Sequence, residues 1–147
     1  MGKVQILAVL TMDGCLSSEL YDKAHQDLCL DRCGLDEIRK KAFYRVTPDY
    51  SISMLHEWRK DCTNIRYLAE ATPDTADYIN GLLRMHAVDE IILYTVPFIS
   101  GSGRHFFKSA LPEQHWTLSS LKSYPNGVCR IIYILDKKDV LSVPNKA

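Results

Sequence analysis

The sequence lacks any long hydrophobic run: no apolar stretch approaches the roughly 20 residues of a membrane-spanning helix. It also lacks an excess of charge, since eighteen Lys and Arg residues balance eighteen Asp and Glu residues among 147 positions. Cations cluster only in short runs such as Arg39-Lys40-Lys41, whereas nucleic-acid binding needs a basic face. We therefore expect no membrane segment and no nucleic-acid partner.

A disulfide framework is also missing. The five cysteines are odd in number and scattered, at Cys15, Cys29, Cys33, Cys62 and Cys129. A chain of this length buries roughly 70% of its unfolded surface without covalent staples. The first residues place one Lys before a brief apolar run that Asp13 ends, which is unlike a secretory signal peptide. We expect reduced thiols, a cytoplasmic location and a single domain over residues 1–147.

Several catalytic and ligand-binding motifs do not occur. The sequence has no GxSxG, no P-loop, no GxGxxG and no HExxH, so hydrolase, nucleotide triphosphatase, Rossmann and zinc-protease interpretations lack their usual support. Cys29 and Cys33 have helical i, i+4 spacing but no second ligand pair, which predicts packing and no metal site. Among the five histidines, His105 is the one site candidate, with a solvated loop position as the alternative.

What is present is an alternation of strand and helix patterns. Apolar and β-branched runs predict strands over residues 4–10, 65–69 and 88–96, and a strand or extended edge segment over 42–47. Helical spacing predicts helices over 19–30, ended by Gly34, over 51–61, and from Thr72 to about Ala87. Two further strands, 116–124 and 128–135, flank Pro125-Asn126-Gly127, a hairpin turn. The pattern predicts an α/β domain with a mostly parallel sheet and a C-terminal antiparallel hairpin.

Two loops are candidate ligand sites. A glycine-rich loop, Ser100-Gly101-Ser102-Gly103, follows the predicted strand 88–96, and its backbone could approach a ligand closely or simply satisfy turn geometry. Thr11 and Asp13 follow the first strand, where ligands of open α/β sheets gather. The alternative for Asp13 is a turn with a locally bonded carboxylate.

Three segments together resemble a known family. They are VQILAVLTMDGCLS (4–17), VDEIILYTVPFISGSGRHFF (88–107) and WTLSSLKSYPNGVCRIIY (116–133). The first strand ending in Thr-x-Asp-Gly, the Val-Asp-Glu strand followed by Gly-x-Gly and Phe, and the Asn-Gly-Val hairpin occur in this order. This is similar to the C-terminal reductase domain of bacterial riboflavin-biosynthesis deaminase-reductases, which is dihydrofolate-reductase-like.

The resemblance implies a dihydrofolate reductase-like three-layer domain that pairs into a homodimer. It implies an NADPH-dependent reductase acting on a pyrimidine- or pterin-like heterocycle, in which the cofactor brings the chemistry. Carried over by position, Ala8, Thr11 and Asp13 would line the substrate and nicotinamide side, with Asp13 catalytic. The cofactor-binding residues would be Ser100, Gly101, Ser102 and Gly103, together with Thr72.

The sequence departs from the family where the cofactor phosphates bind. Relatives place a Gly-Gly pair there, at a helix start, whereas this chain has Ala71-Thr72-Pro73-Asp74. Pro73 has no N–H to donate, and Asp74 and Asp77 bring negative charge. The family's Gly-Arg-x-Thr element is also absent between residues 20 and 71. Two main hypotheses remain: a reductase with a rearranged cofactor site, or a reductase-fold protein that binds a ligand or acts as a dimeric accessory without cofactor. A third is that the resemblance extends to the fold only and the ligand is unrelated.

Overall fold

The computed structural model describes residues 2–16, 33–61, 64–99, 101, 104–108 and 110–136. Its strands are β1 (Lys3–Leu10), β2 (Cys15–Leu16), β3 (Tyr44–Arg45), β4 (Arg66–Glu70), β5 (Glu90–Thr95), β6 (Arg104–His105), β7 (Trp116–Ser123) and β8 (Cys129–Leu135). Its helices are α2 (Leu35–Lys41), α3 (Ile52–Asp61) and α4 (Ala76–Arg84). The helix expected over 19–30 lies outside the described residues. None of the described helices combines the length and apolar character needed to cross a membrane.

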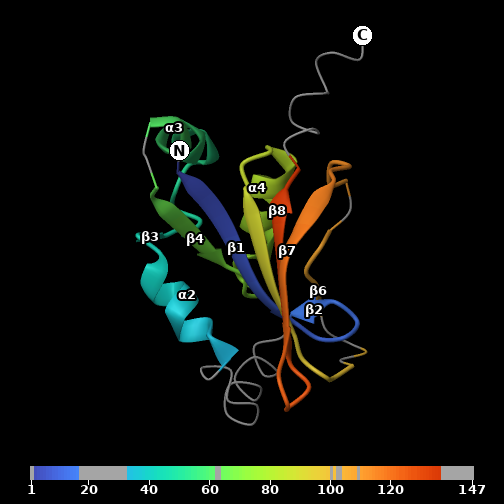
Figure 1. Ribbon diagram of the computed structural model, residues 1–147. Helices are drawn as coiled ribbons and strands as arrows, with labels where there is room; N and C mark the ends of the chain where they lie inside the picture. The colour runs from blue at the N-terminus through green and yellow to red at the C-terminus, as the bar shows by residue number, and fades with distance from the viewer. Residues whose placement is uncertain are drawn as a thin grey trace.

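Six strands form one sheet in the order β3-β4-β1-β5-β8-β7 (Figure 1). β1 pairs in parallel with β4 on one side and β5 on the other, and β3 adds to β4 in parallel. β8 runs antiparallel to β5, and β7 antiparallel to β8. The predicted α/β fold, a mostly parallel sheet closed by an antiparallel hairpin, is confirmed.

β1 takes the central position because it is apolar on both faces. Residues 4–10 are all buried, as expected of a strand covered on both sides. The one polar exception, Gln5, is 6% exposed, and its Nε2 donates a hydrogen bond to Glu90 Oε2 at 3.0 Å. Since a buried amide is tolerated when it is hydrogen-bonded, Gln5 fits the strand without breaking the apolar layer.

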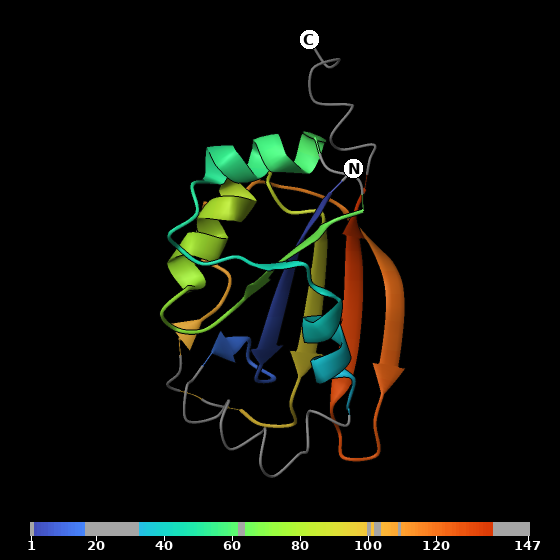
Figure 2. The same ribbon diagram turned by 90° about the vertical axis from the view of Figure 1, so that its left-hand side faces the viewer.

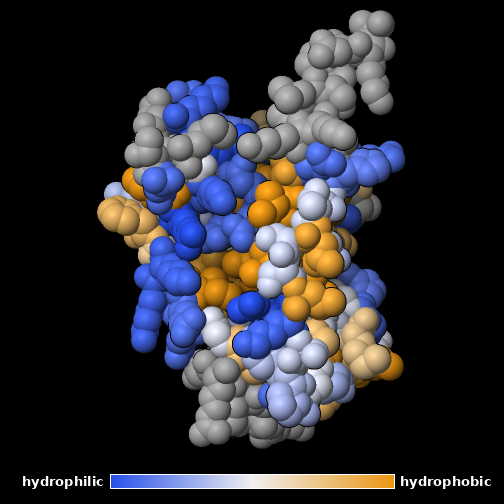
Figure 3. Space-filling view, in the orientation of Figure 1, coloured by the Kyte–Doolittle hydropathy of each residue, from blue (hydrophilic) through white to orange (hydrophobic). Residues whose placement is uncertain are grey.

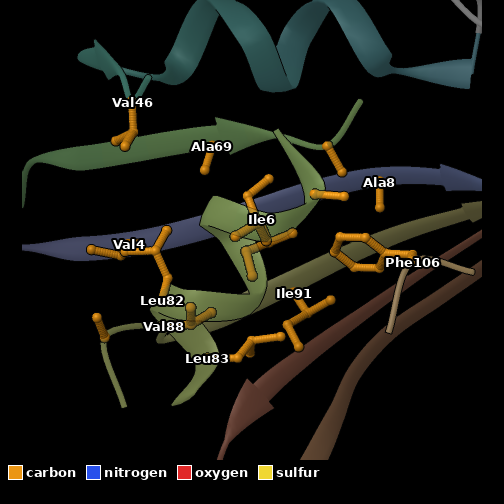
Figure 4. Packing of buried hydrophobic residues seen from close by; sticks show 14 of the residues in the cluster. Val4, Ile6, Ala8, Val46, Ala69, Leu82, Leu83, Val88, Ile91 and Phe106 are labelled. Atoms are coloured by element: carbon orange, nitrogen blue, oxygen red, sulfur yellow. The ribbon is translucent and has the colours of Figure 1, made fainter. Parts of the chain in front are cut away.

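α3 and α4 cover one face of the sheet. Val4, Ile6 and Ala8 alternate toward this face and pack with Leu82 of α4 and Ile91 of β5 (Figure 4). Leu82 and Ile6 are completely buried. Fully burying such a side chain contributes about 1.5–3 kcal/mol, so this layer holds the helices on the sheet.

α2 covers the opposite face. Leu7 and Val9 of β1 point there and pack with Leu35 of α2 and Tyr94 of β5. Figure 2 shows α3 and α4 lying together and α2 apart from them. On the face seen in Figure 3, apolar side chains gather in the middle between hydrophilic regions. The domain therefore has three layers, helix, sheet and helix, as the dihydrofolate reductase-like expectation required.

The Val-Asp-Glu segment ahead of β5 anchors two strands. Asp89 Oδ2 accepts a hydrogen bond from the Val4 N–H at 2.9 Å, and the Asp89 N–H donates to the Val4 carbonyl at 2.9 Å. Arg59 Nη1 of α3 lies 3.4 Å from Asp89 Oδ1. Burial raises the pKa of Asp89, although the Val4 N–H and the Arg59 charge oppose the shift. In this fold the motif joins the starts of β1 and β5.

The expected strand boundaries hold better than the helix boundaries. α4 begins at Ala76, four residues after the predicted start, and ends at Arg84, before the predicted Ala87. Residues 72–75 form a turn in which the Thr75 N–H donates to the Thr72 carbonyl at 3.1 Å. Gly34 adopts a left-handed conformation (φ 83°) directly ahead of α2, a helix that the sequence reasoning did not predict.

The predicted hairpin is confirmed. Gly127 has φ 90°, which favours glycine, and its N–H donates to the Tyr124 carbonyl at 3.0 Å. Asn126 Oδ1 accepts from the Val128 N–H at 3.2 Å. A Cβ at position 127 would lie 3.1 Å from Pro97 Cγ, so the turn is also packed against the loop after β5.

A candidate ligand site at the carboxyl edge of the sheet

Loops from β1 and β5 meet where these parallel strands end, at the lower end of the sheet in Figure 1. β2, just after the first loop, pairs antiparallel with β6, so that Cys15 stands opposite His105. Met12 adds a link between the loops, because its N–H donates to the Phe98 carbonyl at 2.7 Å. Ligands of open α/β sheets bind at this edge.

Asp13 joins the two predicted site loops. Its Oδ1 accepts a hydrogen bond from the Thr11 hydroxyl, and its Oδ2 accepts one from the Gly101 N–H at 3.0 Å. Thr11 Oγ1 accepts in turn from the Cys15 N–H at 3.0 Å. Gly101 (φ 73°) and Gly14 (φ 77°) adopt the left-handed conformation that favours glycine. The carboxylate is therefore held in a fixed position between two loops of the carboxyl edge.

Cys15 and His105 add a second polar pair to these loops. Cys15 Sγ lies 3.4 Å from His105 Nδ1 and 3.8 Å from the Asp13 carbonyl oxygen. Cys15 is buried and His105 is exposed. Burial raises the pKa of the Cys15 thiol, and the negative charge of Asp13 raises it further. The sulfur is thus held as a thiol, and sequence reasoning singled out His105 but missed Cys15.

The structure brings together some of the expected site residues. Thr11, Asp13 and Gly101 form one hydrogen-bonded unit. Ala8 is 1% exposed and belongs to the core under α4, where Figure 4 places it near Phe106. The remaining residues of the glycine-rich loop, Ser100, Ser102 and Gly103, lie outside the described residues. Thr72 lies in the turn between β4 and α4.

This β4–α4 turn does not fit a cofactor diphosphate. The Thr72 N–H donates to Thr75 Oγ1 at 2.8 Å and the Thr75 N–H to Thr72 Oγ1 at 3.2 Å, so two donors are used within the turn. Pro73 has no N–H, and Asp74 and Asp77 are exposed carboxylates. A diphosphate favours free N–H donors and positive charge, whereas the Thr72 and Thr75 N–H groups are already bonded and the turn carries carboxylates.

Positive charge is available elsewhere at the edge. Arg104 of β6 is exposed, and it forms no ion pair within the part of the chain that the structure describes. By contrast, Arg39 and Arg45 are both engaged by Glu70. In the described ranges, no three His, Cys, Asp or Glu side chains gather as metal ligands would.

A shallow apolar groove lies on the α4 face of the outer strands. Its volume is about 350 Å³ and it is lined by Ile91, Leu93, Phe107, Trp116 and Tyr133. Nearly all of its wall is hydrocarbon, so it offers contact area and few hydrogen-bond partners. It suits an apolar surface better than a polar heterocycle.

Solved structures share this fold. A candidate riboflavin biosynthesis protein from Shewanella sp. PV-4 matches with a TM-score of 0.54 and 10% identity, covering 91% of this chain and 99% of that one. A pyrimidine reductase-like protein from Corynebacterium diphtheriae matches with a TM-score of 0.52 and 14% identity, covering 91% and 92%. RibD from Acinetobacter baumannii matches with a TM-score of 0.53 and 10% identity. The chain spans 58% of that RibD.

No family model matches the sequence, and no curated protein matches it. The likeness to these solved structures shows the fold of this protein, and it covers most of the chain. The fold is the one that these riboflavin-biosynthesis and pyrimidine reductase-like structures share, as the sequence motifs indicated.

Proposed function

We propose that this protein is a reductase that uses NADPH to reduce a small pyrimidine- or pterin-like heterocycle. The observation that carries the proposal is the bridge from Asp13 to the Thr11 hydroxyl and the Gly101 N–H. It places a carboxylate between two loops at the edge where this fold binds ligands. The heterocycle would lie against these loops, with Asp13 as the polar group that orients it.

The cofactor phosphates need a binding site other than the β4–α4 turn. Arg104 supplies an exposed positive charge next to the glycine-rich loop, and Lys108 follows the same segment. Under the proposal, these cations hold the phosphates in place of the Gly-Gly donors. When bound, the nicotinamide supplies the hydride, while the chain supplies orientation and the exclusion of water.

A second candidate follows from the same turn. The Thr72 and Thr75 N–H groups are bonded within the turn, which carries Asp74 and Asp77, and both Asp13 oxygens accept hydrogen bonds from within the chain. These features favour a ligand-binding or accessory protein that keeps the fold without a dinucleotide. The two candidates differ in one measurable property, which is the affinity for NADPH.

The test is a titration of the protein with NADPH and NADH, followed by calorimetry and by the rise of the melting temperature. A reductase shows saturable stabilisation that grows with cofactor concentration, and Arg104→Gln weakens it while Lys60→Gln, at an exposed position of α3, does not. Absence of binding at millimolar cofactor, or equal loss in both variants, contradicts the NADPH proposal and leaves the second candidate.

We also propose that the protein forms a homodimer through the outer strands. Leu118 and Leu121 are 52% and 63% exposed, and their strand partners Tyr133 and Ile131 place them on the face of the apolar groove. Exposed apolar area of this kind is typical of interfaces. Light scattering after size exclusion should give a dimer mass, and Leu121→Lys should give a monomer.

A further inference from the structure

Arg130 lies at the start of β8, on the face of the sheet that α2 covers. It stands directly opposite Tyr94 of β5 on one side and Lys122 of β7 on the other. Directly opposite residues point to the same face, so the three side chains share one surface. This surface lies at the carboxyl edge of β5, near the lower end of the sheet in Figure 1.

Arg130 is a partly buried cation that no carboxylate of the described residues neutralises. Its Nε is buried and has no hydrogen-bond partner in the described part of the chain. No ion pair to Arg130 is formed there either. A buried guanidinium N–H without an acceptor costs free energy, and a negative charge bound beside the guanidinium would offset part of this cost electrostatically.

Two tyrosine hydroxyls and a bare glycine surround the guanidinium. The Tyr94 and Tyr124 hydroxyls both donate to the Cys33 carbonyl at 2.8 Å. A Cβ at position 34 would lie 3.4 Å from Arg130 Nη1, 3.7 Å from the Tyr94 hydroxyl and 3.9 Å from the Tyr124 hydroxyl. The positive φ of Gly34 and this close approach leave room for the arginine and hold its stem in place.

Lys122 brings a second positive charge to the same surface. Its Nζ lies 5.3 Å from the centre of the Tyr124 ring. Like charges on directly opposite strand residues destabilise a sheet, so the Lys122–Arg130 pair costs stability when no anion is bound. Glu37 is the described carboxylate whose charge reaches Tyr124, and it forms no ion pair with either cation in the described structure.

We propose that Arg130 and Lys122 form a binding site for a phosphate group. Two positive charges balance a phosphate dianion. Arg130 hydrogen-bonds the Tyr94 side chain, and the other donors of its planar guanidinium can match the phosphate oxygens. The group could come from free phosphate or from a phosphorylated ligand such as a sugar phosphate. The site is independent of NADPH binding and of hydride transfer, so it stands or falls separately from the proposed reductase.

The experiment measures binding of inorganic phosphate and of ribose 5-phosphate by calorimetry and thermal shift, without cofactor, at constant ionic strength set by chloride. The variants are Arg130→Met and Lys122→Met, and the control is Lys60→Met, at an exposed position of α3. We expect saturable binding that weakens about tenfold or more in both site variants and is unchanged in the control. Tighter binding of ribose 5-phosphate than of phosphate identifies an ester ligand, and equal binding identifies free phosphate.

Two results would overturn the site. One is no saturable binding of either probe to the unmodified protein at millimolar concentration. The other is an equal loss of affinity in Lys122→Met and Lys60→Met, which would show general charge attraction. Lys122 is exposed, so Lys122→Met should fold. If Arg130→Met fails to fold, Lys122→Met still decides whether the site binds phosphate. Arg130→Lys keeps the positive charge but loses the planar, multiply donating guanidinium. Its affinity for phosphate should therefore lie between that of Arg130→Met and that of the unmodified protein.

Discussion

Cys15 Sγ lies 3.4 Å from His105 Nδ1, across the two-residue strands β2 and β6. This contact pins the loop after β1 to the segment after the glycine-rich loop. Because the thiol is buried beside Asp13, its surroundings favour the neutral form. The pair therefore joins the loops without providing a reactive thiolate.

The raised pKa of Cys15 predicts slow alkylation. With iodoacetamide at mildly alkaline pH, Cys15 should react much more slowly than it does in urea-unfolded protein, because burial and the Asp13 charge both disfavour the thiolate. Asp13→Asn removes the charge and should speed the reaction only in part, since burial remains. Peptide mass spectrometry measures both rates, and equal rates in folded and unfolded protein would contradict the prediction.

Asp13 offers a separation of function from stability. Asn at position 13 keeps an acceptor for the Gly101 N–H and an amide that can donate to Thr11 Oγ1, so Asp13→Asn should unfold near the urea midpoint of the unmodified protein. Asp13→Ala leaves the buried Thr11 hydroxyl without its acceptor, while the exposed Gly101 N–H can bind water, and should cost about 1–3 kcal/mol. If the protein is a reductase, Asp13→Asn should also reduce turnover. An unchanged rate would remove Asp13 from the site.

Asp89 predicts a definite sign of pH dependence. Its pKa is raised in the folded protein, so the folded state holds this proton more tightly, and its contribution to stability falls as pH rises from the ordinary value of 3.8 through the folded pKa. Arg59→Met removes a charge that lowers this pKa, and should extend the fall to higher pH.

At neutral pH the same variant should lose about 1–2 kcal/mol, less than a fully buried pair would lose. Arg59 and Asp89 keep side-chain exposures of 16% and 24%. Urea unfolding at a series of pH values from about 4 to 7 spans this window. A slope identical to that of the unmodified protein would mean that Arg59 does not influence Asp89.

Tyr94 predicts the alkaline limit of stability. Burial, with a smaller effect of Tyr124, raises the pKa of Tyr94 to about 12 from 10.0. The unfolded chain therefore loses this proton first, and stability falls by about 2 kcal/mol as pH rises from 10 toward 12. Tyr94→Phe should flatten this fall because phenylalanine has no proton to lose. The Cys33 carbonyl keeps a hydrogen bond in this variant, since Tyr124 still donates to it. Unfolding followed by circular dichroism at these pH values provides the measurement.

The core and the groove wall should respond differently to truncation. Leu7 is fully buried between α2 and the sheet, so Leu7→Ala should cost about 2–5 kcal/mol. Leu93, in the neighbouring strand, is half-buried and lines the apolar groove, so Leu93→Ala should cost less. Comparable losses in the two variants would show that the groove is filled.

The sheet could be predicted from the sequence because its strands are continuous apolar runs, and β1 and β5 are the clearest of them. α2 was missed because it has few apolar residues and follows Gly34, a residue type that ends helices more often than it precedes them. The start of α4 was placed too early because the Thr72 and Thr75 N–H groups each donate to the other residue's hydroxyl. The spacing of residues in a sequence does not reveal such reciprocal hydrogen bonds.

The site was predictable in the same uneven way. Asp13 and Gly101 could be expected at one edge because each follows a parallel strand. The pairing of Cys15 with His105 and of Lys122 with Arg130 depends on strand register, which a single sequence does not fix. Within the hairpin, the Asn-Gly turn locates Lys122 near Arg130, but it does not reveal that Tyr94 and Gly34 lie beside them.

The central position of β1 also affects how the chain folds. Val4 and Asp89, which exchange hydrogen bonds at the start of β1 and β5, are 85 positions apart in the sequence. During synthesis β1 leaves the ribosome long before its partner strands β4 and β5, so its apolar side chains stay unpaired until those strands emerge. Such long-range parallel pairing makes folding slow and exposes aggregation-prone surface. We expect the hairpin of β7 and β8, whose contacts are local, to form early, and the yield of folded protein to depend on chaperones that protect β1.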